Sequence, residues 1–297
     1  MKNELRLILH KYNIFTRKIV YKNTARIYDD RIVLKPVVNT KIPDIYKYLR
    51  SRSFDYFPNP IEVFREYEVY PFIKDVNEPV GQRAQDIMHL VSLLHSKTTF
   101  YSEIDIDKIK EIYETVMNKV NYLLDYYNML IDDIEKEIYM SPSSYLIARN
   151  INIIFDSIYY VRENIEMWYK LEENSKTIRN VNIHGNINLD HYIKDDKPYL
   201  ISWNNSRIDN PIYDLLTFYK NNYLDIDFYD LLKYYEKNYP LKQDERLLLF
   251  VYMAIPPIIK WENNEYKMCI RINKVIDYLY KTNNLIKNYQ KNDGSFC

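Results

Sequence analysis

Hydrophobic and polar positions alternate along much of the first 75 residues, as they do in β-strands that bury one face. Helical spacing covers residues 1–11, and a second short helix is predicted to open near Pro43, because proline is favoured in a first turn. The turn of the predicted hairpin lies near Glu66. The β-like segments, in chain order, are residues 16–22, 24–29 and 31–37 and the hairpin at 58–76.

After Gly81 the spacing of apolar residues becomes helical and stays so over most of the chain. Ser141 followed by Pro142 is a good helix start, and that helix is predicted to reach Trp168 or Glu172. Residues 180–203 interrupt the helices with another β-like stretch. The predicted helices, in chain order, are 84–100, 105–139, one from 142, one from 212, 225–238, 242–255 and 273–286.

This order of segments predicts an α+β protein with two lobes. The small lobe covers residues 1–75 and the larger, mostly helical lobe covers residues 76–297, with a loop of polar residues at 182–203. No Gly/Ser-rich linker and no internal repeat separates the two, so we expect a tight connection.

The amino-acid composition limits the classes of partner that we expect the chain to bind. The chain has 297 residues with 47% hydrophobic and 28% charged residues, and 41 basic residues balance 41 acidic ones. A neutral chain gives no support for binding nucleic acid or an anionic membrane. The longest apolar run, residues 247–259, is broken by Pro256 and Pro257, and residues 1–12 do not resemble a signal peptide. The two cysteines, Cys269 and Cys297, form no disulfide framework, so we expect a cytoplasmic protein.

The stretch from Asn180 to Tyr219 carries the candidate chemistry. Transfer of phosphate from ATP needs a lysine on the phosphates, a carboxylate that orients the acceptor hydroxyl, and further acidic or amide groups that hold Mg²⁺. Lys35, in the predicted strand 31–37, is the candidate phosphate-binding lysine. The loop at 182–203 is where the other groups are expected.

Three fragments at this spacing resemble the aminoglycoside phosphotransferase and choline kinase branch of the kinase-like superfamily, and within it the spore-coat CotS-type subgroup. That branch has a His-Gly-Asp-x-x-x-x-Asn loop, an Ile-Asp-Trp/Phe strand and an Asp-Pro-x-x-Asp-Leu helix start. The resemblance spans nearly the whole chain and implies a protein-kinase-like fold with an ATP-binding cleft. The matching segments are His184-Gly185-Asn186, His191, Ile201-Ser202-Trp203, Asn210–Leu215 and, upstream, His95 at the end of a helix.

The chain departs from the family at the positions that carry the chemistry. Asn186 replaces the catalytic aspartate, and an amide can act neither as a carboxylate base nor as an anion. Ser202 replaces the metal-binding aspartate and His191 replaces the metal-assisting asparagine, although Mg²⁺ prefers carboxylate oxygens. Only three glycines occur in the chain, so the glycine-rich cover of the phosphates is missing. The only acid on the helix after Lys35 is Asp44, which is a poor partner for it.

The residues that match the family best have structural roles in the resemblance. There, His184 packs the loop, Gly185 allows a tight turn, and Asp214 caps its helix and holds the loop backbone. Nearby acids could in principle restore the missing charge, but two would have to reach productive geometry together. The candidates are Asp190, Asp195, Asp196 and Asp209.

The sequence therefore favours a pseudokinase with a binding or scaffolding role, in spore-coat assembly if its source sporulates. The alternative is an ATP-dependent small-molecule phosphotransferase that uses the substituted residues, with ATP and Mg²⁺ as cofactors. A third hypothesis is a metal-free ligand-binding protein with a remodelled cleft, which would be lined by aromatic rings instead of acids. The sequence does not identify the ligand or protein partner.

Overall fold

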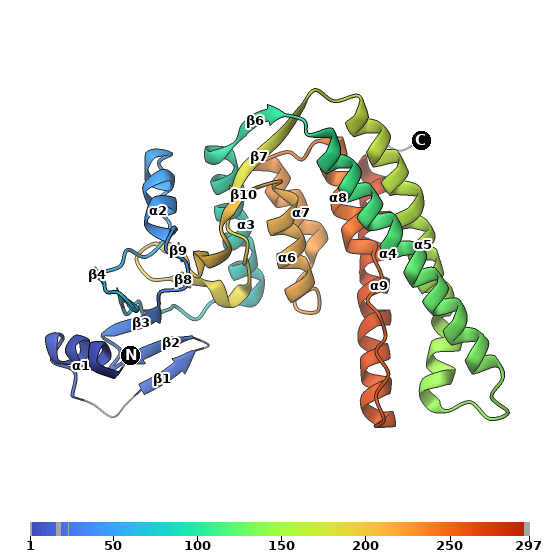
Figure 1. Ribbon diagram of the computed structural model, residues 1–297, viewed down its shortest axis with the longest axis horizontal. Helices are drawn as coiled ribbons and strands as arrows, with labels where there is room; N and C mark the ends of the chain where they lie inside the picture. Colours follow the sequence, from blue (N-terminus) through green and yellow to red (C-terminus); the bar gives the residue numbers. More distant parts are fainter. Residues whose placement is uncertain (1, 16–18, 23, 294–297) are drawn as a thin grey trace.

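The computed structural model describes residues 2–15, 19–22 and 24–293 (Figure 1). Part of the first predicted strand, residues 16–18, and the thiol of Cys297 lie outside these residues. The chain begins with helix α1 (Lys2–Lys11) and continues into a five-stranded antiparallel sheet of order β1-β2-β3-β5-β4. Its strands are β1 (Ile19–Lys22), β2 (Ala25–Tyr28), β3 (Ile32–Pro36), β4 (Glu62–Val63) and β5 (Tyr67–Pro71).

A small hydrophobic core holds α1 against this sheet. Ile8 of α1 and Ile14 pack with Ile32 and Leu34 of β3, which alternate along the strand and so point to the same face. Val69 of β5 completes the layer. The alternation in the sequence therefore placed the sheet correctly, and the predicted hairpin turns between β4 and β5.

Helix α2 (Ile42–Ser51) belongs to the large core of the molecule and not to this small one. Pro43 stands in its first turn, as predicted. Tyr46 stacks on Phe57 with 4.1 Å between ring centroids, and the ring of Phe57 lies 6.1 Å from that of Trp203. Aromatic packing therefore holds α2 against the turn that begins at Trp203, at the end of the polar segment.

The rest of the chain is mostly helical. Helices α4, α5 and α9 run side by side as a long arm on the right of Figure 1, while α3, α6 and α7 stand between this arm and the N-terminal sheet. Ser141 caps α5 as predicted, because its hydroxyl accepts a hydrogen bond from the Ser144 amide at 3.1 Å. The helices are α3 (Val80–Thr98), α4 (Ile106–Glu135), α5 (Pro142–Glu173), α6 (Ile212–Asn222), α7 (Phe228–Asn238), α8 (Gln243–Ala254) and α9 (Glu265–Asp293).

Two small sheets carry the polar segment. β7 pairs with β6 and with β10, and β8 pairs with β9; 3₁₀ turns cover Leu189–His191 and Trp203–Asn205. The strand predicted over residues 197–203 ends at Leu200, because Ser202 has a φ of 71° and cannot continue an extended chain. The strands are β6 (Phe100–Glu103), β7 (Thr177–Ile183), β8 (Tyr192–Lys194), β9 (Pro198–Leu200) and β10 (Arg207–Asp209).

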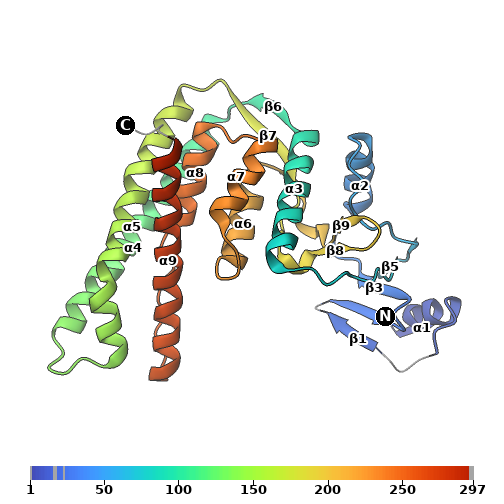
Figure 2. The ribbon, with the colours of Figure 1, turned by 180° about the vertical axis from the view of Figure 1, so that it is seen from behind.

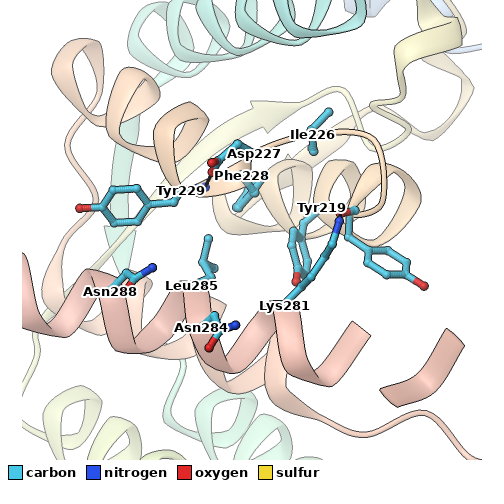
Figure 3. A pocket seen from close by; sticks show the side chains of 10 residues that line it. Tyr219, Ile226, Asp227, Phe228, Tyr229, Lys281, Asn284, Leu285 and Asn288 are labelled. Carbon is cyan, nitrogen blue, oxygen red and sulfur yellow. Dashed lines mark hydrogen bonds between the residues drawn. The ribbon is translucent and has the colours of Figure 1, made fainter. Parts of the chain in front are cut away.

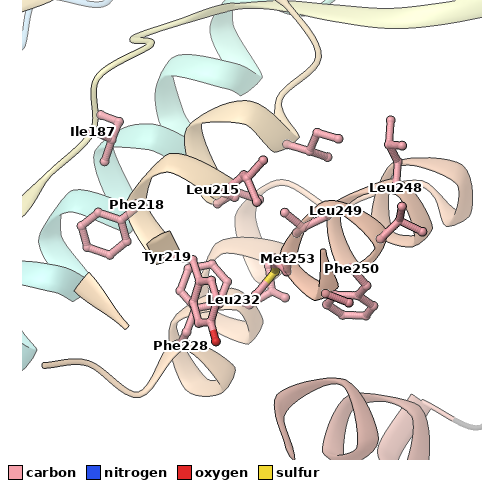
Figure 4. Close-up of a cluster of buried hydrophobic side chains, with 14 of the residues drawn as sticks. Ile187, Leu215, Phe218, Tyr219, Phe228, Leu232, Leu248, Leu249, Phe250 and Met253 are labelled. Carbon is pink, nitrogen blue, oxygen red and sulfur yellow. The ribbon is translucent and has the colours of Figure 1, made fainter. Parts of the chain in front are cut away.

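Part of the large core lies where α6, α7 and α8 meet. Figure 4 shows Leu215 of α6 on the side of Leu232 of α7 and Met253 of α8, and Phe218 of α6 on the side of Ile187; all of these side chains are buried. This core supports the polar segment from behind, since Ile187 belongs to the same cluster. None of the described helices combines the length and the apolar character that a membrane span requires.

Candidate functional site

The loop after β7 turns sharply at Gly185. Gly185 has a φ of 76°, a left-handed conformation that only glycine adopts without strain. A Cβ atom there would lie against the carbonyl group of Asn205, much closer than van der Waals contact allows. The glycine is therefore needed twice, once for the turn and once because the Trp203–Asn205 turn packs against its backbone.

Asp214 holds this loop from below. Its carboxylate accepts hydrogen bonds from the amides of His184 at 2.8 Å and Gly185 at 2.7 Å, and lies 3.1 Å from Nε2 of His95. Burial alone would raise the pKa of Asp214, but the hydrogen bond from His95 and the other donors lower it below its ordinary value. The carboxylate is thus a buried anion whose oxygens are already occupied.

The side chain that bonds to the first turn of α6 is that of Asn210 and not that of Asp214. Asn210 accepts a hydrogen bond from the Ile212 amide at 3.1 Å through its side-chain oxygen. The carboxylate of Asp214, predicted to cap this helix, points instead to the loop and to His95.

His184 is a neutral imidazole inside the protein. Its Nε2 donates to the carbonyl of Ile201 at 2.9 Å, its Nδ1 accepts from the Asn186 amide at 3.3 Å, and its ring lies 4.5 Å from that of Trp203. Burial lowers the pKa of His184 to about 4. This side chain joins the loop to the strand region around Ile201 and has no nitrogen left for a substrate.

His191 is oriented by the loop itself. Its Nδ1 donates to the carbonyl of Asn186 at 2.6 Å, and its own carbonyl accepts from the Ile201 amide at 2.9 Å. A neutral imidazole that donates through Nδ1 keeps Nε2 as an acceptor. The predicted residues Asn186 and His191 are therefore in direct contact, and Ser202 follows Ile201 at the edge of the same loop.

The acid that faces Lys35 is Glu68 and not Asp44, which the sequence already marks as a poor partner. Asp44 is exposed on α2, whereas Glu68 stands directly opposite Lys35 in the pairing of β3 with β5 and attracts its ammonium group. Burial lowers the pKa of Lys35, and Nζ lies 5.3 Å from the ring centre of Tyr70. Glu68 is itself buried and accepts from the Tyr70 hydroxyl at 2.8 Å. The prediction missed Glu68 because only strand register places it beside Lys35.

None of the four acidic residues that were candidates to replace the missing carboxylates is buried. Asp190, Asp195 and Asp196 are exposed, and Asp209 pairs with Arg207 at 2.8 Å. Asp209 stands opposite Val181 in the pairing of β10 with β7, two residues along the strand from the Ile183 end that leads into the loop. Across residues 2–15, 19–22 and 24–293, no group of three His, Cys, Asp or Glu side chains is arranged to hold a metal ion.

Two cavities lie on either side of the loop between α6 and α7, and the predicted site residues line neither. One, of about 330 Å³, separates this loop from α9 (Figure 3), and the other, of about 320 Å³, separates it from the start of α3. Figure 3 shows Tyr219, Phe228 and Tyr229 facing Asn284 and Asn288 of α9. The sequence carried no signal for these cavities, because they form between segments far apart along the chain.

Solved structures identify the fold. No model of a known protein family matches the sequence, and no curated protein matches it. An aminoglycoside phosphotransferase from Alicyclobacillus acidocaldarius superposes with a TM-score of 0.66 at 9% identity, covering 96% of each chain. A spectinomycin phosphotransferase in its AMP-bound complex gives 0.53 at 13% identity, covering 94% of this chain and 97% of its own. A glucosamine kinase gives 0.51 at 8% identity over 92% and 76%.

The arrangement of a small antiparallel sheet and a larger helical region is therefore a kinase-like fold. More narrowly, it is the version of that fold found in aminoglycoside phosphotransferases, as the sequence motifs predicted. At these identities the similarity establishes the fold alone. The CotS-type resemblance stays a prediction.

Proposed function

We propose that this chain is a pseudokinase, a kinase-like protein whose cleft does not transfer phosphate and whose role is binding or scaffolding. The observation that carries the proposal is Asn186. It stands in the loop that Asp214 and Gly185 hold, at the position where the resemblance expects the catalytic carboxylate. A neutral amide cannot take a proton from an acceptor hydroxyl.

The metal positions support the same proposal. Ser202 offers a hydroxyl and His191 an imidazole, and neither is a ligand that Mg²⁺ prefers. Asp214 does not replace them, because its carboxylate is fully buried and is bonded to two loop amides and to His95. The residues present do not fit Mg²⁺, so we derive no catalytic step through it.

The alternative function, an active ATP-dependent phosphotransferase, has one observation in its favour. The hydrogen bond from Nδ1 of His191 to the Asn186 carbonyl leaves Nε2 as a hydrogen-bond acceptor in the candidate loop. Such a nitrogen could accept a proton from a hydroxylated acceptor. It does not replace the missing negative charge.

Binding of a small ligand is favoured by the cavity between the α6–α7 loop and α9. Aromatic rings of Tyr219, Phe228 and Tyr229 form much of its wall, although the cavity lies among the helices and is not the remodelled cleft of the third hypothesis. Thermal-shift measurements with small-molecule sets, repeated with Leu285→Trp to fill the cavity, test this version of the binding role.

The decisive experiment compares the melting temperature with ATP in the presence and absence of Mg²⁺ or Mn²⁺, together with transfer of labelled phosphate from ATP. We expect no metal-dependent rise in melting temperature and no turnover. A large metal-dependent rise with turnover would establish the phosphotransferase instead. The double variant Asn186→Asp/Ser202→Asp then shows whether the two charges alone restore metal-dependent nucleotide binding.

The domain limits and the location belong to this proposal too. We divide the protein at residues 1–75 and 76–297, and place it in the cytoplasm, with a place in the spore coat if its source sporulates. Immunodetection in fractionated cells and spores tests the location. Recovery from the supernatant of vegetative cells alone would remove the spore assignment.

A further inference from the structure

The turn between α4 and α5 exposes large apolar side chains among acidic ones. Ile138 and Tyr139 are 90% and 92% exposed, and Met129 of α4 is 68% exposed. Between residues 132 and 137 the sequence has four Asp or Glu and one Lys. We call this surface, formed by Met129, Asp132, Glu135, Ile138 and Tyr139, the acidic tip. Neighbouring apolar side chains with this exposure add nothing to the folded monomer and are typical of a protein contact.

The N-terminal region has the opposite composition. Residues 1–31 contain eight Lys or Arg and three Asp or Glu. The exposed apolar residues here are Phe15 at 77%, Val20 at 40% and Tyr21 at 66%. Together with the exposed Arg6 and Lys22, they form what we call the basic end.

The basic end also has an open strand edge. β1 is the first strand of the sheet, and in the described part of the chain only β2 pairs with it. All four residues of β1 are exposed. An edge of this kind presents unpaired backbone groups that can bond to a second chain.

The two surfaces lie at opposite ends of the molecule. Figures 1 and 2 show the N-terminal sheet at one end of the longest axis and the turn between α4 and α5 at the other. Their charges are opposite, although the whole chain has no net charge. Tip-to-tip contact would place acids against acids, whereas contact of a tip with a basic end pairs opposite charges and covers apolar side chains on both.

We propose that the chain self-associates head to tail, with the acidic tip of one copy docked on the basic end of a second copy. Such a heterologous contact leaves one tip and one basic end available, so further copies can add. The proposal goes beyond the role of the cleft, because both surfaces lie outside it. A phosphotransfer result does not bear on it, and monomeric behaviour does not bear on the cleft.

Sedimentation velocity of the full chain over a range of concentrations tests the proposal, at low and at high salt. We expect association that strengthens with concentration and weakens with salt, because exposed charges are screened over roughly 10 Å at 0.1 M ionic strength. Two variants each change one of the two surfaces of the proposed contact. The tip variant is Asp132→Asn/Glu135→Gln/Tyr139→Ser, and the basic-end variant is Arg6→Gln/Lys22→Gln/Tyr21→Ser, so that the two altered surfaces do not attract each other.

Each variant alone should associate at least about tenfold more weakly than the native chain. An equimolar mixture of the two should form 1:1 dimers and stop there, because each partner retains one native surface that matches the other's. Tyr159→Ser, which changes another exposed tyrosine on α5, is the matched control and should associate like the native chain. Unfolding midpoints show that the variants are folded.

Two results would overturn the proposal. One is a native chain that stays monomeric at low salt and high concentration. The other is a mixture of the two variants that shows no dimer while the native chain associates, because that result would place the contact on other surfaces.

Discussion

At the scale of single residues, the candidate site is built from groups that satisfy one another. Asp214 bonds to two loop amides and to His95, whose Nδ1 lies 2.7 Å from the hydroxyl of the buried Tyr235. His184 uses both ring nitrogens within the loop. Asn186, at the position where the proposed function expects a catalytic acid, has a neutral side chain.

Gly185→Ala tests how far the loop depends on its backbone. Alanine would have to adopt a φ of 76° and would contact the Asn205 carbonyl, so we expect a loss of about 2–4 kcal/mol of unfolding free energy. Urea denaturation measures this loss. Gly81→Ala in the first turn of α3 is the control, since no atom lies within 4 Å of its added Cβ.

That control should be neutral or stabilise the protein by up to about 1 kcal/mol, because alanine favours helix. Equal changes in the free energy of unfolding for the two substitutions would contradict the close contact between Gly185 and Asn205.

At the scale of elements, a buried polar junction joins the end of α5, strand β7 and the start of α8. Arg179 of β7 forms an ion pair with Glu245 of α8, and its guanidinium carbon lies 4.3 Å from the ring centre of Tyr239. Glu172, in the last turn of α5, is only 3% exposed and hydrogen-bonds to Asp244. Burial first, and then the neighbouring carboxylate, raises the pKa of Glu172 to about 8.

Glu172 should therefore make the protein less stable as pH rises. With a pKa of about 8 in the folded state against 4.5 ordinarily, it keeps its proton on folding in a range where the unfolded chain has lost it. Stability is full below pH 4.5, falls as pH rises toward 8, and changes no further above it. Glu172→Gln should remove this dependence.

Urea denaturation at about pH 5 and about pH 8.5 measures the effect. Between these two pH values the native chain should lose on the order of 2–4 kcal/mol more free energy of unfolding than Glu172→Gln. Glu163→Gln, an exposed site on the same helix, is the control and should follow the native curve. Parallel curves for the native chain and Glu172→Gln would contradict the raised pKa.

At the scale of the whole molecule, the segment between β5 and α3 connects the sheet to the helical region, and side chains hold it in place. Arg83 of α3 donates to the carbonyl of Tyr192 at 2.7 Å and to the carboxylate of Asp75. Lys194 of β8 pairs with Glu78 at 2.6 Å and Asp86 at 2.9 Å. The amide of Val76 donates to the carbonyl of Lys194 at 2.9 Å. The connection is therefore bonded along its length to the hairpin that follows the candidate loop.

Arg83→Ala should loosen this connection without unfolding the protein. Removing the guanidinium takes one donor from the Tyr192 carbonyl and one from the Asp75 carboxylate, which keeps the Lys194 amide at 2.9 Å, at a cost of about 1–3 kcal/mol. We expect hydrogen exchange at Val76 to become about tenfold faster, while amides in α4 and α5 keep their native rates. Lys136→Ala, which removes an exposed ion pair with Asp133, should leave every rate in the connection unchanged.

Much of the architecture could be predicted from local patterns. Alternating residues in β3, the proline in the first turn of α2 and the Ser141 cap of α5 each act within a few positions, so the sequence alone identified them. Phe100 was expected to end a helix and lies in β6, because its pairing with Asn180 of β7 outweighs local preference. Helix α9 begins at Glu265, eight positions before the start that was predicted at residue 273.

By itself, the sequence determined the identity of the groups at the candidate site, since Asn186, Ser202 and His191 lack the carboxylates of a phosphotransfer centre wherever the chain folds. Only the tertiary structure decided which groups meet. Strand register places Glu68 beside Lys35, and the approach of α6 to the loop occupies the oxygens of Asp214. The reason is physical: chemical character belongs to each residue, whereas contact between residues distant in the chain is fixed by packing.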